Sequence, residues 1–172
     1  MRPRSTMILA ATLGMALSII GNPRSGGQQA SKDDGDQTSG GVQVVASVAK
    51  EQFKVNEPLK LKLVLVNNSA EERRLISIGS GKDYKLDVRD DQGTPAPLTA
   101  AEDVARRHEG FSISKGLIIL KPGEEHEDYV LVTKRHNLWI PGKYFIIAKR
   151  DGPVLDGRSG MIKSNKVTVT IE

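Results

Sequence analysis

Cysteine is absent from this chain of 172 residues. Its absence excludes disulfide bonds, thiolate nucleophiles, zinc–cysteine sites and iron–sulfur clusters. It also excludes a lipoprotein anchor, because that attachment needs a cysteine at the cleavage site. A folded domain of this chain must therefore be stabilised by burial of its core, for which about 130 residues are sufficient.

Aromatic residues are sparse, at 4% of the chain, and Trp139 is the only tryptophan. The core must therefore consist mainly of Val, Ile and Leu, which favours β-strands. Trp139 is predicted to cover the core, with a role in ligand binding as the alternative. Tyr144 is predicted to begin a strand near the end of the fold, where sandwich domains often hydrogen-bond a tyrosine to nearby backbone.

No run of lysine and arginine stands next to aromatic residues, so nucleic acid is not an expected partner. Charged residues make up 27% of the chain and give a net charge of +4. Basic and acidic residues are interleaved, as in the segment 121–125. This pattern is typical of a solvated protein surface.

The chain also lacks the sequence signs of an enzyme. There is no nucleophile elbow and no phosphate-binding loop. The three histidines, His108, His126 and His136, are not at metal-ligand spacing. His126 lies in the acidic stretch Glu124–Asp128, which is interpreted as a solvated turn entering a strand, with a divalent cation site as the alternative. We predict no catalytic, cofactor-binding or metal-binding residues, and no cofactor.

The first 21 residues have the layout of a signal peptide. A basic start, Met1–Ser5, precedes an uncharged and largely apolar run, Thr6–Ile20, that is short for a membrane span. We expect an extracytoplasmic protein, periplasmic or secreted, whose mature chain starts between Gly21 and Ala30. An uncleaved signal segment is the alternative and the only expected membrane association. Residues 22–41 contain no large apolar side chain and are predicted to be a disordered polar linker.

From Val42 onward the hydrophobic pattern alternates with a period of two, which indicates strands. In Leu59–Asn67, for example, four leucines share one face. A helix is predicted at Thr99–Gly110, with Thr99 as its N-cap and Glu102 in the capping-box position. The predicted strands, which are separated by turn signals, are Val42–Ala49, Gln52–Val55, Leu59–Asn67, Arg73–Ile78, Tyr84–Arg89, Gly116–Lys121, Asp128–Thr133, Lys143–Lys149 and Lys166–Ile171.

Short strands at this spacing, without long helical crossovers, predict an all-β fold for residues 42–172. We expect an antiparallel, immunoglobulin-like β-sandwich of about 7–9 strands with one short helix in a connection. One core should contain the residues at the centres of the apolar runs, namely Leu61, Leu63, Val88, Ile119, Val130, Ile146 and Val169.

Several turn and strand segments carry a resemblance to known domains. They are the turn at 55–59, the strand end Asn67–Ser69, and the segments 87–93, 120–124, 140–144 and 163–169. Together they resemble the immunoglobulin-like domains of uncharacterised exported bacterial proteins, and in outline the BsuPI-type proteinase inhibitor domain. The resemblance implies a sandwich fold and names no binding residues.

Two functions follow as hypotheses. The first is a non-catalytic interaction module of the bacterial cell envelope, with a protein or an envelope component as its partner. The alternative is a proteinase inhibitor that acts through an extended loop at residues 150–160, which is rich in glycine and carries Arg158 and Pro153. The sequence predicts no oligomeric state.

Overall fold

The computed structural model describes residues 39–107, 115–155 and 158–172. Over these described residues the fold is mainly β, with 55% strand, two short helices and three mostly antiparallel sheets. This confirms the predicted all-β class and the antiparallel pairing. The predicted signal peptide, most of the predicted linker and His108 lie outside the described residues.

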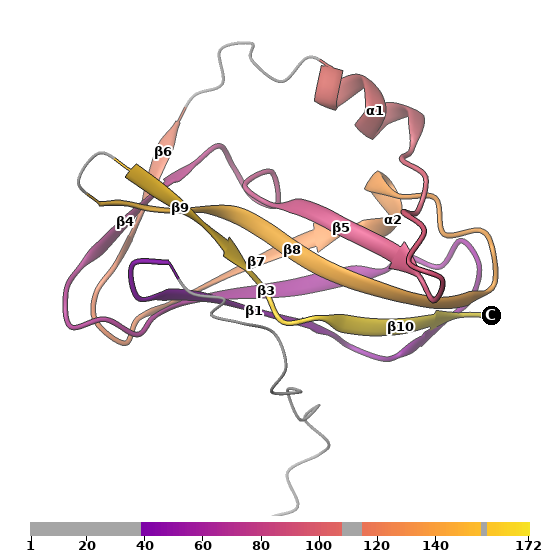
Figure 1. Cartoon of the computed structure of the whole chain (residues 1–172), viewed down its shortest axis with the longest axis horizontal. Coiled ribbons are helices and arrows are strands. Elements are labelled where there is room, and N and C mark those ends of the chain that lie inside the picture. Colours follow the sequence, from indigo (N-terminus) through magenta and orange to yellow (C-terminus); the bar gives the residue numbers. More distant parts are fainter. Residues whose placement is uncertain (1–38, 108–114, 156–157) are drawn as a thin grey trace, which may run out of the picture. The chain divides into compact units, whose positions relative to one another are not determined.

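The first sheet has the strand order β1-β3-β7 (Figure 1). These strands are β1 (Val42–Val48), β3 (Lys60–Asn67) and β7 (Glu125–Leu131). Both pairings are antiparallel. All four leucines of the alternating run that enters and forms β3 are buried, as the period of two predicts.

The second sheet has the order β2-β10-β8-β5, and β9 also pairs with β8. The strands are β2 (Gln52–Phe53), β10 (Val167–Ile171), β8 (Gly142–Leu155), β5 (Lys85–Asp90) and β9 (Arg158–Lys163). The pairing of β2 with β10 is parallel, and the others are antiparallel.

A third, two-stranded sheet joins β4 (Arg73–Ser77) to β6 (Gly116–Leu120) in antiparallel register. Its link to β8 is made by Arg150, whose buried guanidinium donates to the carbonyl oxygen of Ile76 at 3.0 Å. The same guanidinium lies 5.2 Å from the ring centroid of Tyr84. A buried arginine with such partners is satisfied and ties β4 to the second sheet.

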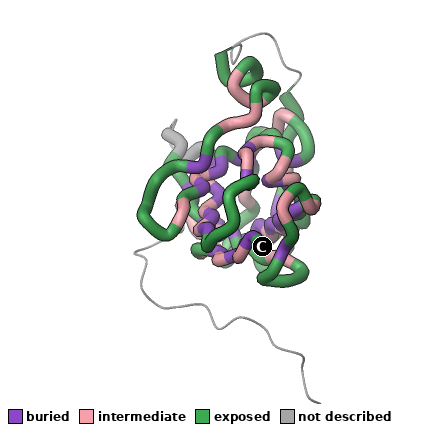
Figure 2. The backbone as a smooth tube through the Cα atoms, turned by 90° about the vertical axis from the view of Figure 1, so that its right-hand side faces the viewer, coloured by how far each residue is buried: buried purple, intermediate pink, exposed green. Residues whose placement is uncertain are grey.

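Buried positions alternate with exposed ones along the strands (Figure 2). Six of the seven residues predicted for the core are buried; the exception is Ile119, which is 48% exposed. The run Gly116–Leu120 is apolar throughout, so its sequence does not show which residues face the core and which face solvent. In the structure Leu120 faces the core, and Ile119 points outward.

The helices are α1 (Ala100–Arg107) and α2 (Val132–Arg135). Thr99 caps α1 as predicted, because its Oγ1 accepts a hydrogen bond of 3.2 Å from the backbone N–H of Glu102. The last residues of the predicted helix lie outside the described part of the chain. The sequence did not predict α2, which is a single turn directly after β7.

The acidic stretch Glu124–Asp128 was interpreted as a solvated turn entering a strand. It does enter a strand, but β7 begins at Glu125, three residues before the predicted start, and Glu125 and Glu127 are exposed within it. Asp128 is buried and accepts hydrogen bonds from Ser80 Oγ at 2.6 Å and from the N–H of Gly81 at 2.8 Å. Glu127 pairs with Lys62 Nζ of β3 at 2.5 Å. These partners allow the carboxylates to sit in a strand.

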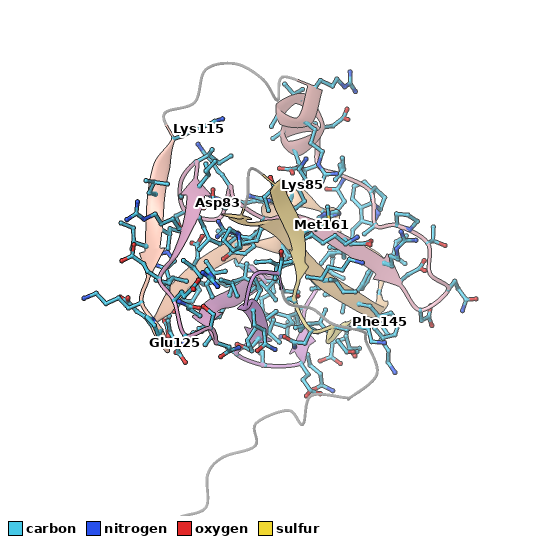
Figure 3. The ribbon with its side chains drawn as sticks, turned by 60° about the vertical axis from the view of Figure 1, so that its left-hand side comes forward. Asp83, Lys85, Lys115, Glu125, Phe145 and Met161 are labelled. Carbon is cyan, nitrogen blue, oxygen red and sulfur yellow. The ribbon has the colours of Figure 1, made fainter. Side chains whose placement is uncertain are left out.

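The loop before β5 is held by polar contacts of two side chains, Arg135 and Asp83. Arg135 donates to the carbonyl oxygens of Gly81 and Tyr84, both at 2.6 Å. Asp83, labelled in Figure 3, accepts from the N–H of Ile78 at 2.6 Å. Gly81 has a φ of +69°, and a Cβ there would lie 2.7 Å from the carbonyl oxygen of Tyr129. Only glycine fits this backbone and this approach.

The extended loop that was expected at residues 150–160 is not found, and this expectation is corrected. Its residues continue β8 to Leu155 and begin β9 at Arg158, so the segment is a β-hairpin. The register shifts between Asp151 and Val154. A shift of this kind accommodates Gly152 and Pro153, which would otherwise interrupt a ladder. Glycine and proline therefore mark an irregularity in a strand here, and not an open loop.

Candidate functional site: a pocket beside Trp139

The connection between α2 and β8 presents two large apolar side chains to solvent. Trp139 is 58% exposed and Ile140 is 60% exposed, whereas Leu138 is buried. The prediction that Trp139 covers the core is therefore wrong, and Leu138 has that role. Leu138, Trp139 and Ile140 are consecutive, so they cannot all point inward from an extended backbone.

This connection is held in place from both ends. The backbone N–H of Asn137 donates to the carbonyl oxygen of Pro97 at 2.8 Å, and its side chain donates to that of Leu98 at 3.0 Å. The hydroxyl of Tyr144 donates to the carbonyl oxygen of Ile140 at 2.9 Å. The last contact is the hydrogen bond to nearby backbone that was predicted for Tyr144. Trp139 is therefore displayed by a segment that is already ordered before any ligand binds.

A pocket of about 190 Å³ lies beside Trp139. We call it the Trp139 pocket, and it is lined by Asn56, Thr133, His136, Asn137, Leu138 and Trp139. The lining residues differ in burial. Asn56 and Trp139 are exposed, Thr133 and Asn137 are half-buried, and His136 and Leu138 are buried.

His136 is only 4% exposed, and its two ring nitrogens differ. Nδ1 lies 3.2 Å from the carbonyl oxygen of Ala96, which requires a proton on Nδ1. Nε2 is buried and has no hydrogen-bond partner among the described residues. A buried polar atom without a partner is rare in folded proteins and calls for an explanation.

The electrostatic surroundings keep this imidazole neutral. Burial lowers the pKa of His136 below its ordinary value of 6.5, and the cations Arg106 and Arg135 lower it further. The carbonyl of Ala96 and the carboxylate of Glu102 act in the opposite direction on the pKa and do not reverse the shift. Nε2 is therefore a hydrogen-bond acceptor at neutral pH.

Two other hollows are larger, and ion pairs neutralise charges in both. One of about 510 Å³ lies beside β2, where Lys50 pairs with Glu57 at 2.5 Å and thereby lowers the pKa of Glu57. The other, of about 260 Å³, lies over β5 and β8 beside Phe145 (Figure 3), where Asp87 accepts from Lys149 at 2.9 Å. The Trp139 pocket differs from both, because an exposed tryptophan and a buried ring nitrogen without a partner among the described residues lie together in its lining, so it is taken as the candidate site.

The other histidine within the described part of the chain, His126, lies on β7 opposite Leu65 of β3. Across the described residues, no group of three or more His, Asp or Glu side chains is arranged to hold a metal ion. Within the described part of the chain, no hydroxyl is hydrogen-bonded to His136, a contact that a nucleophile activated by this histidine would need. The arrangement can bind a ligand through hydrogen bonds and an aromatic ring.

Sequence reasoning singled out Trp139 but did not connect it with His136, Thr133 or Asn56. Asn56 comes from the turn before β3, where it has a φ of +65°. His136 and Thr133 belong to α2 and its end, which the sequence did not predict. The one available signal was the triplet at 138–140, in which at least one large apolar residue had to remain exposed.

No described helix is both long enough and apolar enough to cross a membrane.

No family model matches the chain, and no curated protein matches it significantly. Two solved structures share a distant likeness of fold. One is the alkylpurine DNA glycosylase AlkC of Pseudomonas fluorescens bound to DNA, at 12% identity and a TM-score of 0.37, over 78% of this chain and 31% of that one. The other is the β-glucosidase EmGH1 of Erythrobacter marinus, at 11% identity and a TM-score of 0.40, over 76% of this chain and 15% of that one.

The chain thus spans less than a third of the length of the glycosylase and about a seventh of that of the glucosidase. At these TM-scores, the likeness carries no argument about activity. The comparisons therefore assign the chain to no family, and its function has to be argued from its own residues.

Proposed function

We propose that this chain is a non-catalytic binding domain with an immunoglobulin-like fold, exported to the cell envelope, and that the Trp139 pocket is its binding site. The fold proposal is supported by strand order. In immunoglobulin domains, strands A, B and E share one sheet, and C, F and G share the other. The orders β1-β3-β7 and β5-β8-β10 correspond to A-B-E and C-F-G.

The corner tyrosine supports the same proposal. In immunoglobulin domains it stands near the start of strand F, two residues before a buried cysteine. Tyr144 has this place at the start of β8, and the residue two positions later is Ile146, which is fully buried. Where such domains have a disulfide, this chain would have apolar packing.

The binding proposal depends mainly on the exposure of Trp139. An aromatic ring left in solvent on a segment fixed by hydrogen bonds is typical of recognition sites, where tryptophan is enriched. Export and the envelope are supported by the signal-like first 21 residues, and the proposed partner is an envelope component. The absence of the usual catalytic motifs from the sequence supports a non-catalytic role.

The test is binding of the full-length protein to isolated cell-envelope material, measured by cosedimentation. We expect saturable binding that is lost in Trp139→Ser. The matched control is Leu117→Ser, because Leu117 on β6 is 63% exposed and lies outside the Trp139 pocket. Binding that is equally strong in both variants would place the binding surface elsewhere and contradict the proposal. N-terminal sequencing of exported protein tests the expected start between Gly21 and Ala30.

The alternative, a proteinase inhibitor, depended on an open loop at residues 150–160. Those residues belong mostly to the paired strands β8 and β9, so this premise is lost. Inhibition by another surface stays a separate hypothesis. A panel of proteases tests it, and tight stoichiometric inhibition would favour it over the envelope-binding proposal.

A further inference from the structure

The chemistry of the Trp139 pocket restricts its ligand. None of its six lining residues carries a charged side chain when His136 is neutral. Recognition of carboxylates and phosphates usually relies on arginine or lysine in direct contact. A ligand group held in this pocket should therefore be neutral.

The polar residues of the pocket favour hydroxyl groups. The amides of Asn56 and Asn137 and the hydroxyl of Thr133 each both donate and accept hydrogen bonds. Asn137 Nδ2 already donates to the carbonyl oxygen of Leu98, and Thr133 Oγ1 accepts from the N–H of Leu59. A ligand hydroxyl both donates and accepts, so it can pair with the donors and acceptors that these two bonds leave over. The buried Nε2 of His136 adds an acceptor, which matches the hydrogen of a hydroxyl.

The pocket also combines an aromatic residue with a small volume. The ring of Trp139 offers an apolar face in a lining that is otherwise mostly polar, and a sugar ring has both a face of C–H groups and a periphery of hydroxyls. A volume of about 190 Å³ is below the roughly 300–1,000 Å³ usual for drug-sized ligands, so the pocket holds one small unit.

We propose that the Trp139 pocket binds one neutral sugar residue, with its ring against Trp139 and its hydroxyls hydrogen-bonded to Asn56, Thr133 and Asn137. This inference rests on the proposed binding function and names its ligand class. Nε2 of His136 is covered in the ligand-free protein. A sugar hydroxyl reaches it only when a neighbouring side chain turns aside, which makes His136 a secondary contact.

A peptide ligand fits these observations less well. Peptides are usually held by an open sheet edge, a long apolar groove, a row of aromatic residues or a cluster of arginines. The pocket has a single aromatic residue and lies in a connection, not along a strand edge.

Trp139 is the only tryptophan of the chain, so its fluorescence reports on this site alone. The experiment titrates the purified full-length protein with N-acetylglucosamine, glucose, chitotriose and cellotriose. Galacturonic acid is the charged control, and a neutral peptide rich in serine and threonine is the alternative class. We expect a saturable emission shift with at least one neutral saccharide at millimolar concentrations and none with galacturonic acid. Comparing each sugar with its trimer tells a free sugar from a unit of a polymer as the natural source.

Calorimetry of variants then locates the contacts. Asn56→Gly removes the amide and keeps a residue that tolerates a positive φ. We expect Asn56→Gly and Trp139→Ala to weaken saccharide binding roughly tenfold or more, and Leu117→Ala to leave it unchanged. An unchanged affinity in Trp139→Ala overturns the inference, and so does a panel in which no saccharide binds. If envelope binding still depends on Trp139 in that case, only the sugar inference fails. If envelope binding does not depend on Trp139, the proposed function fails as well.

Discussion

Asn67 was interpreted from the sequence as a turn residue, and in the structure its side chain also holds separate segments together. It ends β3, is fully buried, and donates through Nδ2 to the carbonyl oxygens of Glu71 at 2.7 Å and Leu120 at 2.9 Å. Its Oδ1 accepts from the N–H of Ser69 at 3.0 Å. One amide thus links the end of β3, the following turn and the end of β6.

We predict that Asn67→Ala destabilises the protein by about 2–4 kcal/mol, because it removes the donor to the buried carbonyl oxygen of Leu120 and opens a small cavity. The matched control is Asn68→Ala. Asn68 is exposed, and its side chain donates to the exposed partner Gln43 Oε1 at 3.2 Å, so an effect below about 0.5 kcal/mol is expected. Denaturant unfolding of both variants measures the difference, and equal losses would contradict the role assigned to Asn67.

We predict that the stability of the folded protein depends on pH through His136, and the sign of this dependence follows from the surroundings of its ring. Its pKa in the folded protein is below the ordinary 6.5, chiefly because of burial. When the pH falls through 6.5, the unfolded chain takes up a proton at this residue before the folded protein does. Stability contributed by neutral His136 is therefore fully present above pH 6.5 and decreases below it.

The measurement is the thermal midpoint between about pH 7.5 and pH 5.5. The carboxylate of Asp87, whose pKa is lowered by Lys149, acts only at lower pH and does not enter this window. His136→Asn keeps a donor for the carbonyl of Ala96 and does not titrate, so its midpoint should fall less on acidification. The same decrease in His136→Asn as in the wild type would assign the effect to other groups.

At the scale of elements, strands with a clear alternation were predicted well. β3, β5 and β10 have alternating side chains, and their buried positions are the predicted ones. β6 has no alternation in its sequence, because four of its five residues are large and apolar. Which of them face inward is decided by the register with β4, in which Leu75 is opposite Ile118 and Ile76 is opposite Leu117. Pairing between distant segments is information that a local pattern does not contain.

We predict that Leu120→Ala destabilises the protein by roughly 2–5 kcal/mol, because Leu120 is 1% exposed and packs in the core. Ile119→Ala, one residue earlier, should change stability by less than about 0.5 kcal/mol. The comparison is made by chemical denaturation of the two variants under the same conditions. A larger loss for Ile119→Ala would mean that β6 is turned over relative to this structure.

The hairpin of β8 and β9 and the start of β7 were missed for a different reason. Gly152 and Pro153 are turn residues in most sequences, and Glu125–Asp128 would normally be solvated. In both places a partner from a distant segment changes the outcome. Arg150 can be buried because the hydroxyl of Tyr84 and the carbonyl oxygen of Ile76 accept hydrogen bonds from its guanidinium. Asp128 can be buried because Ser80 and Gly81 donate hydrogen bonds to its carboxylate.

For the whole molecule, the class of fold followed from the sequence, but the grouping of strands into three sheets did not. The candidate site was also beyond the sequence, because Asn56 and Trp139 are brought together only by the packing of α2 next to the turn before β3. Trp139 stood out only as a single unusual residue. Its partners come from turns and a one-turn helix, which leave little trace in a hydrophobic pattern.

The boundary of the folded part is also visible at this scale. Residues 22–41 were predicted to be a linker, yet Gly40 and Gly41 contact the domain. The carbonyl oxygen of Gly40 accepts from Arg73 Nε at 2.7 Å, and that of Gly41 accepts from the N–H of Asn68 at 2.8 Å. Ser39 exchanges backbone hydrogen bonds with Val42 at 3.1 and 3.2 Å. The last three residues of the predicted linker therefore belong to the folded structure.

We predict that a chain starting at Ser39 melts at the same temperature as one starting at Asn22, because the intervening residues contain no large apolar side chain. A chain starting at Val42 loses the bonds to Arg73 and Asn68, worth about 1 kcal/mol each, and should melt several degrees lower. Arg73→Ala in the chain starting at Ser39 is the control. It removes one of the same bonds without shortening the chain, so it should reproduce part of the loss. Calorimetry of the four proteins decides the matter. Equal midpoints for starts at Ser39 and Val42 would place the boundary of the folded part at Val42, whereas a lower midpoint for Ser39 than for Asn22 would place it further toward the N-terminus.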